Sequence, residues 1–340
     1  MGRRMNADAA PVHGGPDAAG AAPHDFSTNA NACGPCPPAL AAVQAADPTR
    51  YPDPACTDLR ERIAAFHGVA RERIVVAASG SEFIARVTAA VAQAARGRGT
   101  VRVPAWAYGD YARAARAQGL GVARGLPARG EVLSWGCDPS SPLGDTPPDL
   151  AARVDALPPG VPFVLDRAYA PLRLAGAPAL DGARLARVWQ LWSPNKALGL
   201  TGVRGAYAVA PAGDAASPLL HALQRLAPSW PLGAHGVAML QAWTEPAAQD
   251  WLAASLPVLR DWKDRQLALC RRLGWAPLAS DASFFCVRLP DGDAGPLLRR
   301  LRAAGVQLRD CASFGLHGHA RLGVRPPASQ AALEEAAAGP

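Results

Sequence analysis

Short apolar runs alternate with helical patterns through the first part of this 340-residue chain. We interpret the runs as strands because they are short and rich in Val, Ile, Leu or Trp. Strands that alternate with helices predict βαβ units and a mostly parallel sheet. The predicted strands lie at 73–78, 100–103, 120–123, 132–135, 162–165, 187–192 and 204–210, and the predicted helices between the first of them lie at 57–66, 79–95 and 108–118.

The pattern changes near residue 219. Residues 219–273 have a helical pattern, and the remainder predicts a strand at 283–289, a helix at 296–304 and strands at 307–309 and 320–324, which is a small α+β unit. Residues 25–55 are rich in Pro, Asn and Asp, and predict an extended segment with turns. We therefore expect a mobile arm at 1–24, a segment at 25–50 that joins the small domain, a large domain at 51–240 and a small domain at 241–340.

Composition excludes several classes of protein. No stretch of about 18 apolar residues exists, so we predict no membrane span, and the N-terminus lacks the apolar core of a signal peptide. We expect a cytoplasmic protein. The net charge of +7 comes from Arg spread along the chain, which gives little support to nucleic-acid binding. The seven cysteines are scattered, and Cys33 and Cys36 have no second pair at zinc spacing, so no metal site is predicted.

Lysine is scarce in this chain. Of 35 basic residues only Lys196 and Lys263 are lysine. Arg can replace Lys as a surface charge but not as an amine that condenses with a carbonyl group. Lys263 has charged neighbours and is predicted to be a solvated helix residue. Lys196 follows a predicted strand and precedes a Gly-rich segment, so it is either a reactive amine or an accidental loop lysine.

Polar residues follow several predicted strands. Ser79-Gly80-Ser81-Glu82 lies between a strand and a helix, where backbone N–H groups and the helix dipole bind phosphate, although an ordinary helix cap has the same pattern. Asp166 ends an apolar strand and Tyr169 follows three residues later. Ser141 and Ser193 also follow strands, and Arg204 comes soon after Ser193. Ligands bind at this edge of open α/β sheets.

Taken together, the motifs resemble the fold-type I pyridoxal-phosphate enzymes, the aspartate aminotransferase superfamily. The pattern Ser-x-x-Lys followed by Gly-Leu-x-Gly-x-Arg is matched from Ser193 to Arg204, and Asp-x-x-Tyr is matched by Asp166 and Tyr169. The resemblance covers about residues 13–335. Within the superfamily the chain is similar to the branch that holds histidinol-phosphate aminotransferase and the threonine-phosphate decarboxylase of cobalamin biosynthesis.

The resemblance implies pyridoxal 5'-phosphate as cofactor and an aspartate aminotransferase-like fold. Lys196, Asp166 and Tyr169 are implied to be catalytic. Tyr108, or alternatively Trp106, is implied to stack on the cofactor ring, and Ser141 stands where the family usually has Asn. The full implied cofactor set is Gly80, Ser81, Glu82, Tyr108, Ser141, Asp166, Tyr169, Ser193, Lys196 and Arg204, with Tyr51 reaching the partner subunit of a homodimer.

The resemblance also implies a small anionic amino-acid substrate. His13-Gly14-Gly15 and the segment 25–35, which includes Asn29 and Asn31, are similar to the start of the cobalamin-pathway proteins. Asn31, Arg309 and Arg321 are the implied substrate residues. Our first expectation is a threonine-phosphate decarboxylase-like enzyme. The alternatives are an aminotransferase for histidinol phosphate or another amino acid, and a non-catalytic cofactor-binding protein.

Overall fold

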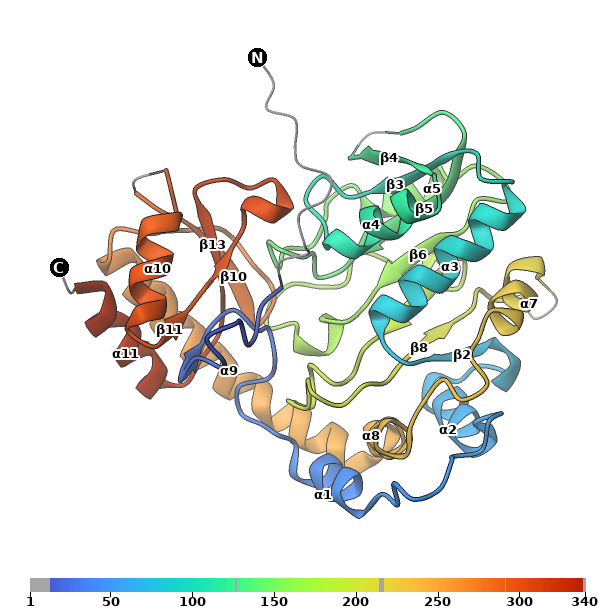
Figure 1. Ribbon diagram of the computed structural model, residues 1–340, viewed down its shortest axis with the longest axis horizontal. Helices are drawn as coiled ribbons and strands as arrows, with labels where there is room; N and C mark the ends of the chain where they lie inside the picture. Colours follow the sequence, from blue (N-terminus) through green and yellow to red (C-terminus); the bar gives the residue numbers. More distant parts are fainter. Residues whose placement is uncertain (1–12, 126, 214–216, 291, 339–340) are drawn as a thin grey trace.

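A seven-stranded sheet forms the centre of the larger part of the molecule in the computed structural model, which describes residues 13–125, 127–213, 217–290 and 292–338 (Figure 1). The strands are ordered β2-β8-β7-β6-β5-β3-β4, and only β8 runs antiparallel to its neighbours. They are β2 (Ile74–Ala77), β3 (Thr100–Val103), β4 (Gly121–Arg124), β5 (Glu131–Cys137), β6 (Phe163–Asp166), β7 (Trp189–Trp192) and β8 (Ala206–Val209). The predicted mostly parallel sheet is confirmed.

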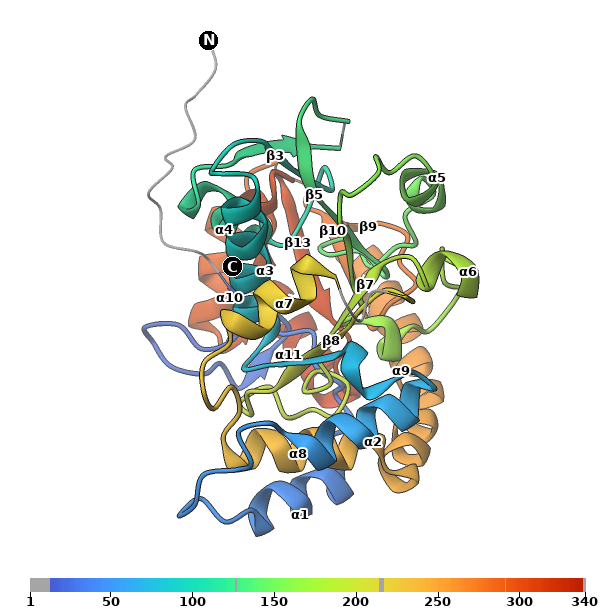
Figure 2. The ribbon, with the colours of Figure 1, turned by 90° about the vertical axis from the view of Figure 1, so that its right-hand side faces the viewer.

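Helices cover both faces of this sheet, as its continuous apolar strands require. Figure 2 shows α3 (Gly80–Ala94), α4 (Gly109–Ala117) and α7 (Pro218–Arg225) on one side and α5 (Leu150–Asp155) and α6 (Gly182–Leu185) on the other. The strand β6 is buried along its whole length. The polar side chain of β6 is Asp166, at the last position of the strand, where the candidate site lies.

The N-terminal segment differs from its predicted form. Residues 25–55 are not extended throughout, because α1 (Pro37–Ala45) forms within them and packs against α8 (Ala234–Thr244). Pro37 and Pro38 occupy the first helical positions. Proline has no backbone N–H, but an N–H group at these positions has no acceptor within the helix, so none of the helical hydrogen bonds is lost. The helix α2 (Thr57–His67) follows, and β1 (His24–Asp25) pairs with β11 (Val306–Gln307). This segment thus contacts both halves of the chain.

The C-terminal part is a small α+β unit, as the sequence predicts. Its antiparallel sheet is ordered β12-β13-β10-β9, from β9 (Ala276–Pro277), β10 (Phe284–Arg288), β12 (Arg309–Asp310) and β13 (His319–Gly323). The helices α10 (Gly295–Ala303) and α11 (Pro327–Ala338) complete it, with a short 3₁₀ turn at Ala312–Phe314. Further 3₁₀ turns lie in the large part, at Arg71–Arg73 and Ala170–Leu172. Within the described residues, no helix is long and apolar enough to cross a membrane.

One long helix, α9 (Pro246–Arg272), joins the two parts (Figure 1). Leu252 and Leu259, in its first half, belong to a core shared with α1 and α8. Leu269 and Cys270, near its end, belong to the core of the small unit. A single rigid element therefore fixes where the strands of the small unit stand relative to the large sheet.

Lys263 of α9 is not the solvated residue that its charged neighbours suggest. Its side chain is buried, and Nζ donates hydrogen bonds to the carbonyl oxygens of Ser280 (2.6 Å) and Ala282 (2.8 Å). Position on the inner face of the helix outweighs the polarity of adjacent residues, because neighbours in sequence point to other faces. Burial lowers the pKa of Lys263 to about 8.

This buried amine predicts a pH-dependent contribution to stability. The unfolded chain holds the Lys263 proton up to its ordinary pKa of 10.5. Between about pH 8 and that value it therefore binds more protons than the folded chain, so the folded state gains stability as pH rises. We expect the unfolding free energy of the wild type, minus that of Lys263→Met, to increase by about 2–3 kcal/mol between about pH 8 and pH 10. Urea denaturation of both proteins measures it, and a flat difference would contradict the assignment.

Candidate active site

The predicted site residues gather at one edge of the large sheet. Asp166 is the last residue of β6, and Ser193 directly follows β7. Lys196 lies in the turn after β7, with Nζ 5.7 Å from the centre of the Tyr169 ring. Burial lowers the pKa of Lys196; the charge of Asp166 opposes this shift and that of Arg204 adds to it. Lys196 therefore has an amine with a lowered pKa and lies within electrostatic range of the Asp166 carboxylate. Both properties favour a reactive amine over an accidental loop lysine.

Asp166 is fixed by a donor on each oxygen. The Tyr111 hydroxyl donates to Oδ2 at 2.7 Å, and the backbone N–H of Ala168 donates to Oδ1 at 2.9 Å. Burial raises the pKa of Asp166, while the hydrogen bond from Tyr111 acts in the opposite direction. A buried carboxylate with fixed direction is suited to bind a cationic N–H group.

The start of α3, at Gly80 and Ser81, faces Ser193 across a narrow space, which we call the cradle. A Cβ atom at Gly80 would lie 2.9 Å from Ser193 Oγ, so the absence of a side chain keeps that space open. The Ser79 side chain caps the helix by accepting from Glu82 N at 3.0 Å. Glu82 itself pairs with Arg86 at 3.0 Å, so its carboxylate is used inside the helix. Gly80, Ser81 and Ser193 are the members of the predicted set that an anion at this helix start can contact.

Tyr108 and Trp106 differ in position. Tyr108 is half-buried, its hydroxyl lies 3.1 Å from Ser81 Oγ, and burial raises its pKa. Trp106 is 42 % exposed. The contact between Tyr108 and the cradle favours Tyr108 as the aromatic that stacks on a bound ring.

Two buried arginines lie side by side in the small unit. Arg309 of β12 and Arg321 of β13 are directly paired residues, and their guanidinium groups lie 4.8 Å and 5.6 Å from the centre of the Phe314 ring. Arg321 donates to the Ser27 carbonyl at 3.0 Å and to Ser141 Oγ at 3.5 Å. Burial lowers the pKa of Arg309 to about 10, and the charge of Arg321 adds to the effect. An anion between two such like charges would stabilise both.

The large and small units meet around Tyr169. Its ring packs edge-on against Phe284 with centres 4.7 Å apart, and Phe284 also lies under Arg321 at 5.7 Å. Burial raises the pKa of Tyr169, and Arg321 opposes the shift. A series of side-chain contacts thus runs from the Lys196 amine through the Tyr169 and Phe284 rings to Arg321.

Asn31, an implied substrate residue, has its side chain held by hydrogen bonds within the chain. Its Nδ2 donates to the Ala197 carbonyl (3.1 Å) and to Ser255 Oγ (2.8 Å), and its Oδ1 accepts from Cys33 N (3.0 Å). Its backbone N–H donates to the Lys196 carbonyl at 2.9 Å. Asn31 therefore fastens the Lys196 turn to α9 and has no amide hydrogen left for a substrate. Asn29, which is also buried, lies beside Tyr169.

Two predicted cofactor residues lie at the surface of the single chain. Arg204 is exposed. Tyr51 is 78 % exposed, and its ring stacks on that of Trp230 with centres 4.5 Å apart.

The sequence interpretation missed three contributors to the site: Tyr111, Phe284 and Phe314. Tyr111 could have been found, because it stands three residues after Tyr108 at the start of a helix and so shares its face. The roles of the two phenylalanines depend on how the two units meet, which no local pattern encodes. Among the described residues, no cluster of His, Cys, Asp or Glu could hold a metal ion.

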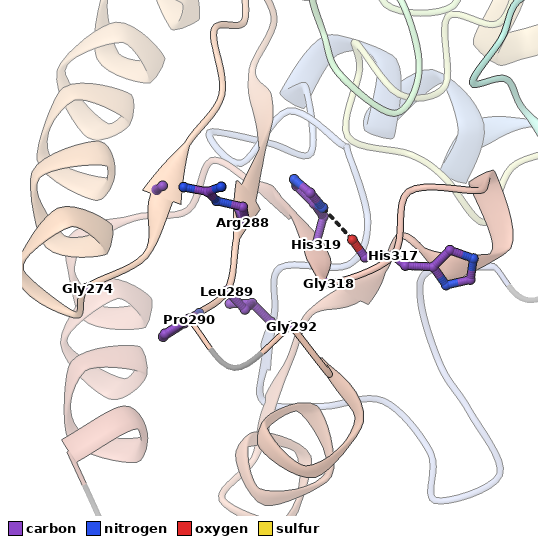
Figure 3. A pocket seen from close by; sticks show the side chains of 9 residues that line it. Gly274, Arg288, Leu289, Pro290, Gly292, His317, Gly318 and His319 are labelled. Atoms are coloured by element: carbon purple, nitrogen blue, oxygen red, sulfur yellow. Dashed lines mark hydrogen bonds between the residues drawn. The ribbon is translucent and has the colours of Figure 1, made fainter.

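A hollow lies elsewhere on the small unit. Figure 3 shows it lined by Arg288, His317 and His319, with the His319 ring bonded to the His317 carbonyl. Arg288 is exposed. This hollow contains none of the predicted site residues, and it supplies a matched surface arginine for experiments.

The fold and the similarity to known proteins identify a fold-type I pyridoxal-phosphate enzyme. The profile of the family "Aminotransferase class I and II" matches residues 23–129 and 133–339, and the chain belongs to that family. Pyridoxal 5'-phosphate is its cofactor.

The chain is similar to several histidinol-phosphate aminotransferases. Over 334 residues it is 29 % identical to "Histidinol-phosphate aminotransferase 2" of Burkholderia mallei, with 92 % of this chain and 90 % of that protein covered. It is 30 % identical over 305 residues to "Histidinol-phosphate aminotransferase 1" of Bradyrhizobium diazoefficiens, with 84 % and 83 % covered.

Solved structures have the same fold. The histidinol-phosphate aminotransferase of Sinorhizobium meliloti, in complex with pyridoxal-5'-phosphate, matches with a TM-score of 0.76 at 22 % identity, covering 91 % of this chain and 88 % of that one. The L-threonine-O-3-phosphate decarboxylase of Porphyromonas gingivalis matches with a TM-score of 0.73 at 19 % identity, covering 91 % and 95 %.

The arginine pair predicts a bound anion that can be detected without turnover. In the cofactor-loaded protein, inorganic phosphate should raise the unfolding temperature by roughly 2–5 °C above sodium chloride of equal ionic strength. Arg321→Gln should lose this difference. Arg288→Gln, which removes an exposed arginine of the same unit, should keep it. Equal stabilisation of all three proteins would mean a general salt effect and no anion site.

Proposed function

We propose that the protein is an aminotransferase for a phosphorylated amino substrate of the histidinol-phosphate type. The observation that carries the proposal is the buried pair Arg309 and Arg321, connected through Phe284 and Tyr169 to the Lys196 amine. Two guanidinium groups bind a phosphate, or a phosphate and a carboxylate, through charge-assisted hydrogen bonds. The dicarboxylate acceptor 2-oxoglutarate has a matching pair of charges.

The residues at the sheet edge fit pyridoxal phosphate. Gly80, Ser81 and Ser193 would hold its phosphate, with Arg204 adding charge from the surface. Asp166 would bind its ring N–H, Tyr108 would stack on its ring, and Tyr169 and Ser141 would lie beside its phenolic oxygen. When bound, the cofactor withdraws electrons from the Cα atom of an amino substrate.

Lys196 would have two roles in this scheme. Its Nζ atom would hold the cofactor covalently until the amine of the substrate displaces it. The freed Nζ would then accept the proton from the substrate Cα. Its lowered pKa favours the neutral amine that this transfer needs. Arg321 and Arg309 meanwhile hold the anionic end of the substrate, which fixes the Cα–H bond relative to Lys196.

Threonine-phosphate decarboxylation is the second candidate. It was favoured by the sequence, from His13-Gly14-Gly15 and the segment 25–35. In the structure the His13 ring lies 5.9 Å from the Tyr108 ring, so this segment borders the site. The similar curated proteins named above are aminotransferases, whereas the decarboxylase is similar in fold at 19 % identity. The comparisons therefore support the aminotransferase better than our first expectation.

We also propose a homodimer in which Tyr51 reaches the partner's cofactor. Its exposed ring, stacked on half-exposed Trp230, supports this arrangement, because two adjacent aromatic rings at the surface of a single subunit are unusual outside interfaces. Exposed Arg204, whose charge acts on Lys196, would then be covered by the second subunit.

A paired assay tests the proposed reaction. Histidinol phosphate with 2-oxoglutarate should yield glutamate, and histidinol should react at least tenfold more slowly, because loss of a charged hydrogen-bond partner costs roughly 1.5–3 kcal/mol. Threonine phosphate should release little carbon dioxide. Carbon dioxide without glutamate would favour the decarboxylase, and neither product from cofactor-loaded protein would contradict both candidates.

A further inference from the structure

Asp166 has an unusually defined environment for a buried carboxylate. The Tyr111 hydroxyl lies 2.7 Å from Oδ2, and Ala168 N lies 2.9 Å from Oδ1. Other charged or titratable groups that face it are Cys137, Lys196 and Tyr169. Of these contacts, the one from Tyr111 is a side-chain donor that a conservative substitution can remove.

The Tyr111 ring is held rigidly in place. It is 1 % exposed and stacks on Trp135 with ring centres 4.4 Å apart and planes 12° apart. Its edge meets the Tyr108 ring at 5.8 Å and 86°. A ring fixed on two sides keeps its hydroxyl aimed at Asp166 without the entropy cost of a mobile donor.

We propose that Tyr111 is a positioning residue for Asp166, which it holds ionised and correctly directed toward the ring nitrogen of pyridoxal phosphate. This inference rests on the proposed function, since it assigns Asp166 to that nitrogen. Tyr108 at the N-cap position and Tyr111 within α4 are three residues apart, so one helix start supplies both the stacking ring and the support for the carboxylate.

The physical reason is a balance between two opposed effects. Burial favours the neutral carboxylic acid at Asp166, and a neutral acid does not attract a cationic N–H group. The Tyr111 hydrogen bond favours the carboxylate. Tyr111 cannot take over the negative charge, because burial and the Asp166 charge raise its own pKa well above the ordinary value. It therefore remains a donor throughout the working pH range.

Equilibrium binding of pyridoxal phosphate to the apoprotein tests the role without turnover. Cofactor affinity should fall on acidification as Asp166 takes up a proton. In Tyr111→Phe the midpoint of this fall should move upward by about one pH unit, which makes binding about tenfold weaker below the midpoint, or roughly 1.4 kcal/mol. The cofactor's own titrations are common to both proteins and cancel.

Tyr207→Phe is the matched control. Tyr207 is a second fully buried tyrosine whose hydroxyl is bonded, at 2.8 Å from His67 and 3.0 Å from Trp243, but it does not contact Asp166. Its removal should lower stability and leave the midpoint unchanged. In an Asp166→Asn background, Tyr111→Phe should have no further effect on the pH profile, because the group through which it acts is gone.

The outcomes separate this inference from the proposed function. No binding of pyridoxal phosphate to the wild type would overturn the proposed function. Normal wild-type binding with an unshifted midpoint in Tyr111→Phe would overturn only the role of Tyr111. An equal effect of Tyr111→Phe with and without Asp166, or a Tyr111→Phe protein that fails to fold while Tyr207→Phe folds, would show a merely structural residue and also overturn it.

Discussion

The placement of a half-buried amine and a buried carboxylate at the same edge of the large sheet is the constraint on which the site depends. Burial lowers the pKa of Lys196 and raises that of Asp166, and the charge of each residue opposes the shift of the other. The remaining parts of the site can be understood as what this pair requires. Tyr111 and Ala168 hold the carboxylate, and Asn31 holds the turn that carries the amine.

A second set of polar contacts holds the loops around this pair. Arg173 bonds to Asp138 and to Thr146 Oγ1, and it lies 3.5 Å from Asp281. These residues come from the turn near Ser141, the segment after Tyr169 and the segment before β10. Lys263 reinforces the last of these segments by bonding to two of its carbonyls. Lys263, the second of the two lysines, thus stabilises a segment next to the site without contacting the Lys196 amine.

The sequence predicts most of the fold because the large sheet is built from strands whose apolar runs are local features. It also predicts which strand ends carry Lys196, Asp166 and Ser193, since chain order and parallel topology bring such ends together. Prediction from the sequence fails where contacts with distant parts of the chain outweigh the local residue pattern. The Pro-rich stretch that forms α1, the burial of Lys263 and the use of Asn31 in packing all depend on elements distant in the chain. The contact between Phe284 and Tyr169 depends on how the two units meet, which the sequence does not reveal.

The central claim is that Lys196 is the amine that binds pyridoxal phosphate, and the scarcity of lysine makes the test decisive. Borohydride reduction of the cofactor-loaded protein, followed by proteolysis and mass spectrometry, maps the pyridoxyl group. Lys263 is the informative competitor, because it is buried and its pKa is also lowered, to about 8, yet it is bonded to backbone carbonyls of its own unit. We predict the adduct on Lys196. An adduct on Lys263, or none on either lysine, would contradict the account.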